Sequence, residues 1–119
     1  MEKIDLAEKL ALIQDHWNPR VVAELNGQQV KLVKLQGTFV WHHHEAEDEL
    51  FLVVNGRLRM DFRDREVWLE PGEMIVVPRG VEHRPYADEE VELLLFEPMS
   101  TLNTGNVRNE RTVEQLERV

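Results

Sequence analysis

The sequence predicts a single all-β domain with a short helix before it and a polar tail after it. A chain of 119 residues with 42% hydrophobic composition fits one compact core and leaves no room for a second. From residue 19 onward, short runs rich in β-branched and aromatic residues alternate with turn-forming dipeptides. Seven or more such strands are typical of a β-sandwich or barrel. The expected organisation is a helix at 1–18, a barrel at 19–98 and a tail at 99–119.

The first expected element is an amphipathic helix from Ile4 to Trp17. Its apolar residues recur at gaps of two to four, close to a helical stripe. Asp5 is a candidate N-cap for this helix. Asn18-Pro19 is expected to stop it, because the residue before a proline avoids the helical region.

The expected strands follow in order along the chain. They are Val30–Leu35, Phe39–His44, Leu50–Val54, Arg57–Arg63, Glu66–Glu70, Met74–Val77 and Val91–Glu97. Asn55-Gly56 predicts a two-residue type I′ hairpin between the third and fourth of these, because that turn needs positive φ at both positions. In the next strand Leu58, Met60 and Phe62 alternate with charged residues, so one face is expected in the core and the other in solvent.

The tail at 99–119 is mostly polar and contains several turn formers. We expect it either to pack on a neighbouring subunit or to be a loose end.

Composition excludes several classes of site and partner. The chain has no cysteine, which excludes disulfides, thiolate metal sites and a cysteine nucleophile. The formal net charge of −9 opposes binding to nucleic acid or to anionic lipid. No apolar run approaches the ~18 residues of a membrane span, and the N-terminus does not resemble a signal peptide. A cytoplasmic protein is therefore the expectation.

The run from Trp41 to Glu49 holds the residues most suited to chemistry. On a strand, His42 and His44 would share one face while His43 points to the other. Taken alone, a His-x-His pair is as consistent with surface histidines in an acidic loop as with a metal site.

Two further residues could complete a metal site with this pair. Glu49 follows after a polar stretch, and His83 comes just after a Pro-x-Gly turn that could return the chain to the same face. Three imidazoles and one carboxylate suit Mn, Fe, Co, Ni, Cu or Zn, and suit Mg or Ca poorly.

The wider spacing is more specific than the histidines alone. Gly37 precedes His42-x-His44, four residues, Glu49, six residues and Gly56; Gly72 precedes five residues, Pro78-x-Gly80, two residues and His83. This pattern resembles the two sequence motifs of the cupin superfamily, and small single-domain cupins of the mannose-6-phosphate isomerase-like group in particular. The resemblance departs in two places: Gly37 lies four residues before His42 where five are usual, and Ala87 stands where the second motif usually ends in asparagine.

The resemblance implies a jelly-roll β-barrel that binds one divalent transition metal ion, such as Fe, Mn, Ni or Zn, through His42, His44, Glu49 and His83. It also implies a small-molecule ligand or substrate and a reaction of the dioxygenase, isomerase or lyase type. The alternative is a non-catalytic cupin that binds a metal or small metabolite. No catalytic acid or base is assigned, since we expect no second carboxylate near Glu49.

The remaining expectations concern groups that point away from the metal. Phe39 and Trp41 have outward parity, as do Leu50 and Leu52, which predicts an apolar patch outside the barrel. Either a second copy of the chain or the N-terminal helix would cover it, so a homodimer is one expectation.

The basic groups near the site do not favour a phosphosugar. Arg79 and Arg84 are the only candidates to bind a phosphate there, and both Arg84 and Tyr86 have parity opposite to His83. We assign neither residue a catalytic role.

Overall fold

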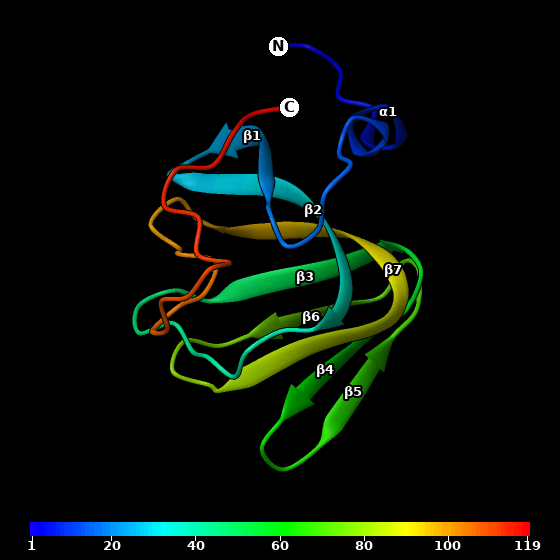
Figure 1. The fold of residues 1–119 in the computed structure, drawn as a ribbon. Helices are drawn as coiled ribbons and strands as arrows, with labels where there is room; N and C mark the ends of the chain where they lie inside the picture. The colour runs from blue at the N-terminus through cyan, green and yellow to red at the C-terminus, as the bar shows by residue number, and fades with distance from the viewer.

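The computed structural model describes all 119 residues, and it is a rolled antiparallel sheet with one short helix outside it (Figure 1). The elements are α1 (Leu6–Ala11), β1 (Arg20–Leu25), β2 (Gln28–Thr38), β3 (Glu49–Asn55), β4 (Leu58–Phe62), β5 (Glu66–Leu69), β6 (Met74–Val77) and β7 (His83–Pro98). The hydrogen-bonded order is β1-β2-β7-β3-β6, and β4 joins β7 to β5. The predicted all-β jelly-roll class is confirmed, although the sheet does not close completely.

Strand β7 holds the two parts of the sheet together. Residues 91–98 pair with β2 on one side, and residues 92–96 pair with β3 on the other. On the β3 side, the first residues of β7 pair with β4, from Phe62↔His83 to Arg59↔Tyr86, while β2 continues along the other side as far as Thr38↔Tyr86. Because one strand of 16 residues serves both parts, the sheet curls around a single core.

The inner face of the sheet forms this core. Leu58 and Met60 are fully buried there, as the alternation of β4 predicted. Asp61 was expected in solvent, but it is only 3% exposed because Arg59 and Arg84 both donate hydrogen bonds to its carboxylate and cover it.

The helix is shorter than predicted. Asp5 does cap it, since its Oδ1 accepts a hydrogen bond from the Glu8 backbone N at 3.1 Å, but the helix ends at Ala11. Trp17 belongs to the barrel core, where its ring stacks on Phe39 at 4.7 Å and its indole N donates to the Gln36 carbonyl. Burying one large aromatic ring outweighs the small gain from extending a surface helix, so the predicted helical stripe to Trp17 was wrong.

The predicted hairpin at Asn55-Gly56 was also wrong. Strands β3 and β4 do not pair with each other, and of the two turn residues only Gly56 has positive φ, at 87°. The chain instead passes close across β7 here: a Cβ on Gly56 would lie 2.8 Å from the Glu90 carbonyl oxygen. Asn26-Gly27 is the pair in which both φ are positive, 52° and 76°, and it joins β1 directly to β2.

Residues 99–119 pack against the barrel of their own chain. The Val21 backbone N donates to the Glu117 carbonyl at 2.9 Å, and the Val119 backbone N donates back to the Val21 carbonyl at 3.1 Å. Arg111 reaches the Thr38 carbonyl at 2.8 Å. In Figure 1 this segment, coloured orange to red, crosses one end of the barrel and finishes near α1.

The outer face of the sheet is only partly covered by the helix. Leu10 and Ile13 pack on Leu32, with Val54 and Leu94 beside them. The helix leaves uncovered an apolar area further along β3, β6 and β7, which we call the outer patch. It consists of Leu50, Leu52, Met74, Val76 and Phe96.

The one helix, of six residues, is too short and too polar to cross a membrane.

Candidate metal centre

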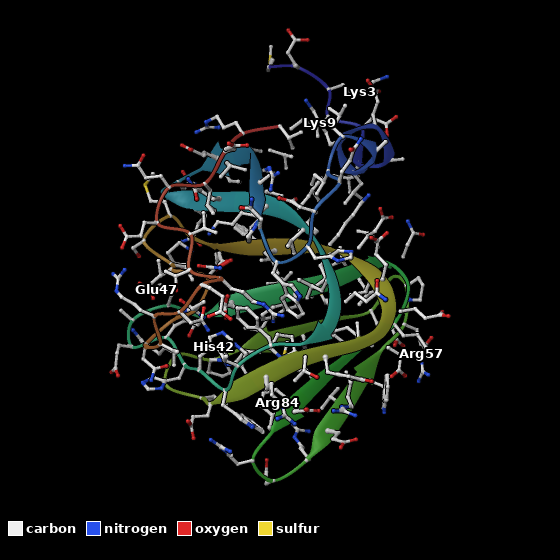
Figure 2. The ribbon with its side chains drawn as sticks, in the orientation of Figure 1. Lys3, Lys9, His42, Glu47, Arg57 and Arg84 are labelled. Carbon is white, nitrogen blue, oxygen red and sulfur yellow. The ribbon has the colours of Figure 1, made fainter.

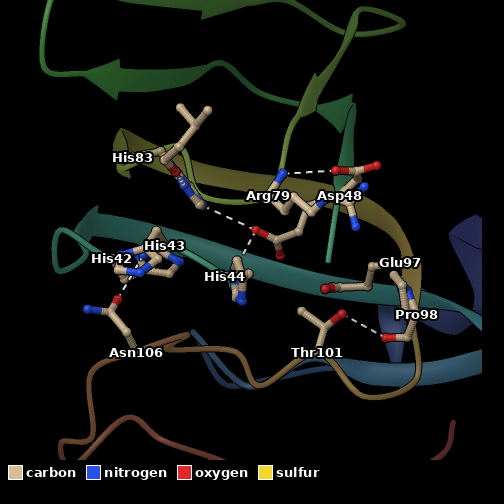
Figure 3. A network of polar contacts seen from close by, with 12 residues as sticks. His42, His43, His44, Asp48, Arg79, His83, Glu97, Pro98, Thr101 and Asn106 are labelled. Carbon is tan, nitrogen blue, oxygen red and sulfur yellow. Dashed lines mark hydrogen bonds and ion pairs between the residues drawn. The ribbon is translucent and has the colours of Figure 1, made fainter. Parts of the chain in front are cut away.

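Four residues from separate parts of the chain converge inside the barrel. His42, His44, Glu49 and His83 each offer one ligand atom, and these atoms all lie within 4.8 Å of one another. Each of the four residues is less than 5% exposed. Figure 3 shows His42, His44 and His83 close to one another, and Figure 2 shows the position of His42 within the whole chain.

Two strand ends and one irregular segment position these side chains. Glu49 begins β3 and His83 begins β7. His42 is held opposite His83 by reciprocal backbone hydrogen bonds of 3.1 and 2.9 Å, which form a single bridge.

The predicted strand Phe39–His44 is therefore wrong, since this segment has no strand apart from that bridge. Strand parity does not apply there, and Phe39, expected outside, is buried at 7% exposure with its ring edge against His42.

Backbone carbonyls fix the orientation of two of the imidazole rings. The Nδ1 atom of His42 lies 3.0 Å from the Val40 carbonyl, and that of His83 lies 2.9 Å from the Val81 carbonyl. A carbonyl can only accept, so Nδ1 carries the proton in both rings. In the neutral ring Nε2 then presents its lone pair to the centre of the cluster, which is the tautomer that a metal ligand requires.

The contacts around Glu49 test whether a cation fits here. Its Oε1 lies 2.8 Å from His44 Nε2 and 3.1 Å from His83 Nε2. His44 Nε2 is nevertheless buried without a well-directed hydrogen bond. A buried polar atom without a partner is costly, and a cation shared by these nitrogens and the carboxylate would satisfy it. The donor set thus fits a transition metal ion.

The protonation states that the fold favours are those of a ligand set. Burial, followed by the nearby charge of His83, lowers the pKa of His42 to about 4. Burial alone would raise the pKa of Glu49, but the close approach of the His44 and His83 rings to its carboxylate outweighs burial and holds the pKa below its usual range. A neutral imidazole beside an ionised carboxylate is the form that binds a metal.

His43 lies outside the cluster, on the side where residues 99–119 pack. Its Nε2 lies 2.7 Å from Glu45 Oε1, and its backbone N donates to Asn106 Oδ1 at 2.9 Å. The backbone of Gly105 presses on the same segment so closely that a Cβ there would meet the His43 carbonyl oxygen. The tail therefore supports the loop that carries His42 and His44.

Sequence reasoning missed two charged residues that share a cavity with this cluster. Lys31 and Glu97 are 2% and 3% exposed, and they line the cavity together with His42 and Glu49. The cavity holds about 490 Å³ of space between atoms, part of it open to solvent. Lys31 Nζ lies 3.5 Å from Glu97 Oε1, and in Figure 3 the Glu97 carboxyl group points toward the histidines.

Glu97 contradicts the expectation that no second carboxylate lies near Glu49. Burial, followed by the negative charge of Glu49, raises the pKa of Glu97 well above its ordinary value. Strand parity could have found the pair: Lys31 is in phase with the buried Val33, and Glu97 with the buried Leu95.

Neither arginine near the second motif lines the cavity, and for Arg84 this agrees with its predicted strand parity. Arg84 forms an ion pair with Asp61 at 3.1 Å and lies over the ring of Trp41. The Arg79 backbone N donates to Asp48. Lys31 is the one lysine or arginine that lines the cavity, which does not favour a phosphosugar substrate.

Comparison with known proteins agrees with this fold and cluster. Residues 28–97 match the family described as "Cupin domain". A solved cupin-2 domain containing protein from Shewanella frigidimarina is 49% identical, with a TM-score of 0.79 over 80% of this chain and 93% of that one.

Two curated proteins are also similar in sequence. The uncharacterized protein YdbB of Bacillus subtilis is 39% identical over 64 residues, which are 53% of this chain and 57% of that protein. The acireductone dioxygenase of Phaeosphaeria nodorum is 31% identical over 126 residues, covering 91% of this chain and 69% of that enzyme.

Proposed function

Because the chain belongs to the cupin family, we propose that it is a mononuclear metalloenzyme that acts on a small organic molecule. In this proposal His42, His44, Glu49 and His83 bind one divalent transition metal ion. The observation that carries it is the convergence of four buried ligand atoms, one of which, His44 Nε2, has no hydrogen bond within the chain. Among dioxygenase, isomerase and lyase reactions, similarity to an acireductone dioxygenase favours the first.

The donor set supports Fe, Mn, Ni or Zn as the ion. When bound, such an ion would supply Lewis-acid or redox chemistry at the coordination positions that four protein ligands leave free. The chain's own residues would hold the substrate beside these positions. Phe39, Phe51, Leu95 and Trp17 give the cavity apolar walls that would limit the water around a bound substrate.

We also propose that two copies of the chain pair through the outer patch. Met74 and Val76 are 59% and 51% exposed, and they lie beside Leu52 and Leu50 across the β3–β6 pairing. A contiguous apolar surface of this kind favours a symmetric contact between like patches.

Metal content tests the ligand assignment. Elemental analysis of untagged protein should find about one transition metal ion per chain in the wild type and almost none in His42→Ala, because removing one ligand opens the site. His43→Ala is the matched control, since His43 lies outside the cluster, and its metal content should equal that of the wild type. Equal metal content in all three proteins would refute the assignment.

A further inference from the structure

The segment that carries two of the proposed metal ligands is held in place by the C-terminal tail. Residues 39–44, which we call the ligand segment, form no strand, so His43 has no strand partner for its backbone. Asn106 binds both backbone groups of His43: the His43 N donates to Asn106 Oδ1 at 2.9 Å, and the Asn106 N donates to the His43 carbonyl at 3.0 Å. Figure 3 shows Asn106 beside His43. The backbone between the ligands His42 and His44 is thus fixed by a residue 63 positions away from His43.

The part of the tail that contains Asn106 is a compact loop. Asn103 closes this loop, because its Oδ1 accepts from the Val113 N at 2.9 Å and its Nδ2 donates to the Arg111 carbonyl at 2.7 Å. Thr104 is fully buried, and its hydroxyl shares a hydrogen bond with the Thr112 hydroxyl at 2.8 Å. Side chains that bind the backbone of their own loop hold the loop in one conformation. We call residues 103–113 the latch loop.

The latch loop contacts the ligand segment at further points. Arg111 Nη1 donates to the Thr38 carbonyl at 2.8 Å, immediately before the ligand segment begins, and the Arg111 guanidinium lies 4.9 Å from the centre of the Trp17 ring. Gly105 fits against the middle of the segment, where a Cβ would collide with the His43 carbonyl oxygen. The latch loop therefore supports the ligand segment both at its start and at its middle.

A second cavity lies between the ligand segment and the tail. It is lined by His44 and the acidic residues Glu45 and Glu47 on one side, and by Gly105 and Asn106 of the latch loop on the other. The cavity holds about 400 Å³ of space between atoms, part of it open to solvent. His44 borders this space although it is only 4% exposed. Movement of the latch loop away from the ligand segment would widen the cavity and expose this ligand to water.

We propose that opening of the latch loop is the step by which a metal ion enters and leaves the cluster, and that Asn106 is the positioning residue that keeps the loop closed. The inference rests on the proposed function, since it requires an ion at the four ligands. It concerns a part of the chain outside the cupin match at residues 28–97. The closed loop orients two of the ligands, and a bound ion in turn stabilises the closed loop, because coupling between two events is reciprocal.

Release of zinc from loaded protein to an excess of a coloured chelator tests the role of Asn106. Asn106→Ala removes the acceptor of the His43 N, and the loss of one hydrogen bond should accelerate zinc release about fivefold. Asn106→Asp keeps an acceptor oxygen at that position, so its release rate should lie within about twofold of the wild-type rate.

Lys9→Met is the matched control for this experiment. It removes the hydrogen bond from Lys9 Nζ to the Val119 carbonyl, which holds the end of the tail, but it leaves the latch loop intact. Its zinc release should equal that of the wild type. Equal release rates for Asn106→Ala and the wild type would overturn the proposal.

Hydrogen exchange followed by NMR tests the reciprocal effect of the ion on the loop and needs no turnover. The backbone N–H groups of Asn106 and Val113 donate hydrogen bonds within the protein, so they exchange when the latch loop opens. Zinc should slow their exchange by about tenfold or more in the wild type. The Leu12 N–H, which donates to the Lys9 carbonyl in α1, should exchange at the same rate with and without zinc.

The exchange rates also separate this inference from the proposed function. Latch-loop amides that do not respond to zinc, in a protein that binds one zinc ion per chain, would overturn the inference and leave the metal assignment intact. A wild type that binds no zinc would refute the proposed function and this inference with it.

Discussion

The inner and outer faces of the same strands depart in opposite ways from the usual pattern, in which apolar side chains are buried and charged ones are exposed. On β3, Glu49 lies inside with Phe51 and Val53, while Leu50 and Leu52 lie on the outer face. The inner face therefore buries a charged carboxylate among apolar residues. The outer face presents apolar side chains on a chain whose net charge is −9.

This difference indicates which two surfaces of the molecule bind a partner. Buried charges and exposed apolar groups both cost free energy in an isolated domain, so each marks a partner that the isolated chain lacks. On the inner face the missing partner is a cation. On the outer face the missing partner is another apolar surface. Neighbouring residues of one strand can serve both, because successive side chains point to opposite faces.

Among substitutions on the inner face, the largest change in the free energy of unfolding is expected for Lys31. At a pH high enough to ionise the buried Glu97 despite its raised pKa, the single variant Lys31→Met leaves that carboxylate without its cation, so the free energy of unfolding should fall by about 3 kcal/mol. Urea unfolding of the metal-free protein measures this. The double variant Lys31→Met/Glu97→Leu is the matched control and should recover to within about 1 kcal/mol of the wild type. A single variant as stable as the wild type would show that the pair is not coupled.

The next effect is the pH dependence of the free energy of unfolding in the metal-free protein. The folded-state pKa of His42 is about 4, whereas that of an unfolded histidine is about 6.5. Between these two values the unfolded chain binds a proton at His42 that the folded chain does not, so lowering the pH favours unfolding. As the pH is lowered, the decrease in the free energy of unfolding should begin near pH 6.5 and level off below pH 4, reaching up to about 3 kcal/mol. Above pH 6.5 this group should contribute no pH dependence.

A comparison of variants isolates this contribution of His42. In a chelating buffer, the slope of stability against pH in this window should be smaller for His42→Ala than for the wild type. His43→Ala should keep the wild-type slope, because His43 lies outside the cluster. Identical slopes for His42→Ala and the wild type would contradict the pKa argument.

Motif spacing predicted the convergence of the four candidate ligands better than local sequence patterns predicted the backbone. The fold class and the convergence of His42 with His83 followed from motif spacing, which does not depend on exact secondary structure. The parity argument failed at Phe39, because residues 39–44 form no regular strand and Phe39 turns inward to meet Trp17.

Long-range packing explains the other differences from the sequence-based expectations. Asn26-Gly27 and Asn55-Gly56 are the same dipeptide, yet only the first connects two paired strands. What separates them is the close passage of Gly56 over β7, a contact between residues more than 30 positions apart that a local pattern cannot contain. Lys31 and Glu97 were within reach of the sequence, but only once their strands were placed beside each other.

The smallest change in the stability of the isolated chain is expected on the outer face, for the variant Val76→Glu. Val76 is 51% exposed on β6, an edge strand that pairs only with β3, so a charge there meets solvent in the isolated chain. The stability of the isolated chain should change by no more than about 0.5 kcal/mol. In a dimer paired through the outer patch, the same two carboxylates would be buried near the symmetry axis without partners.

Light scattering after size-exclusion chromatography should therefore give the mass of two chains for the wild type and of one chain for Val76→Glu. Leu12→Glu is the matched control, because Leu12 is 64% exposed but lies outside the outer patch, and it should remain a dimer. A wild type that elutes as a monomer at high micromolar concentration, or a Val76→Glu variant that remains a dimer, would show that the outer patch does not pair. The exposed apolar side chains of the outer face would then have to be covered by a different partner, while the metal cluster on the inner face would be unaffected.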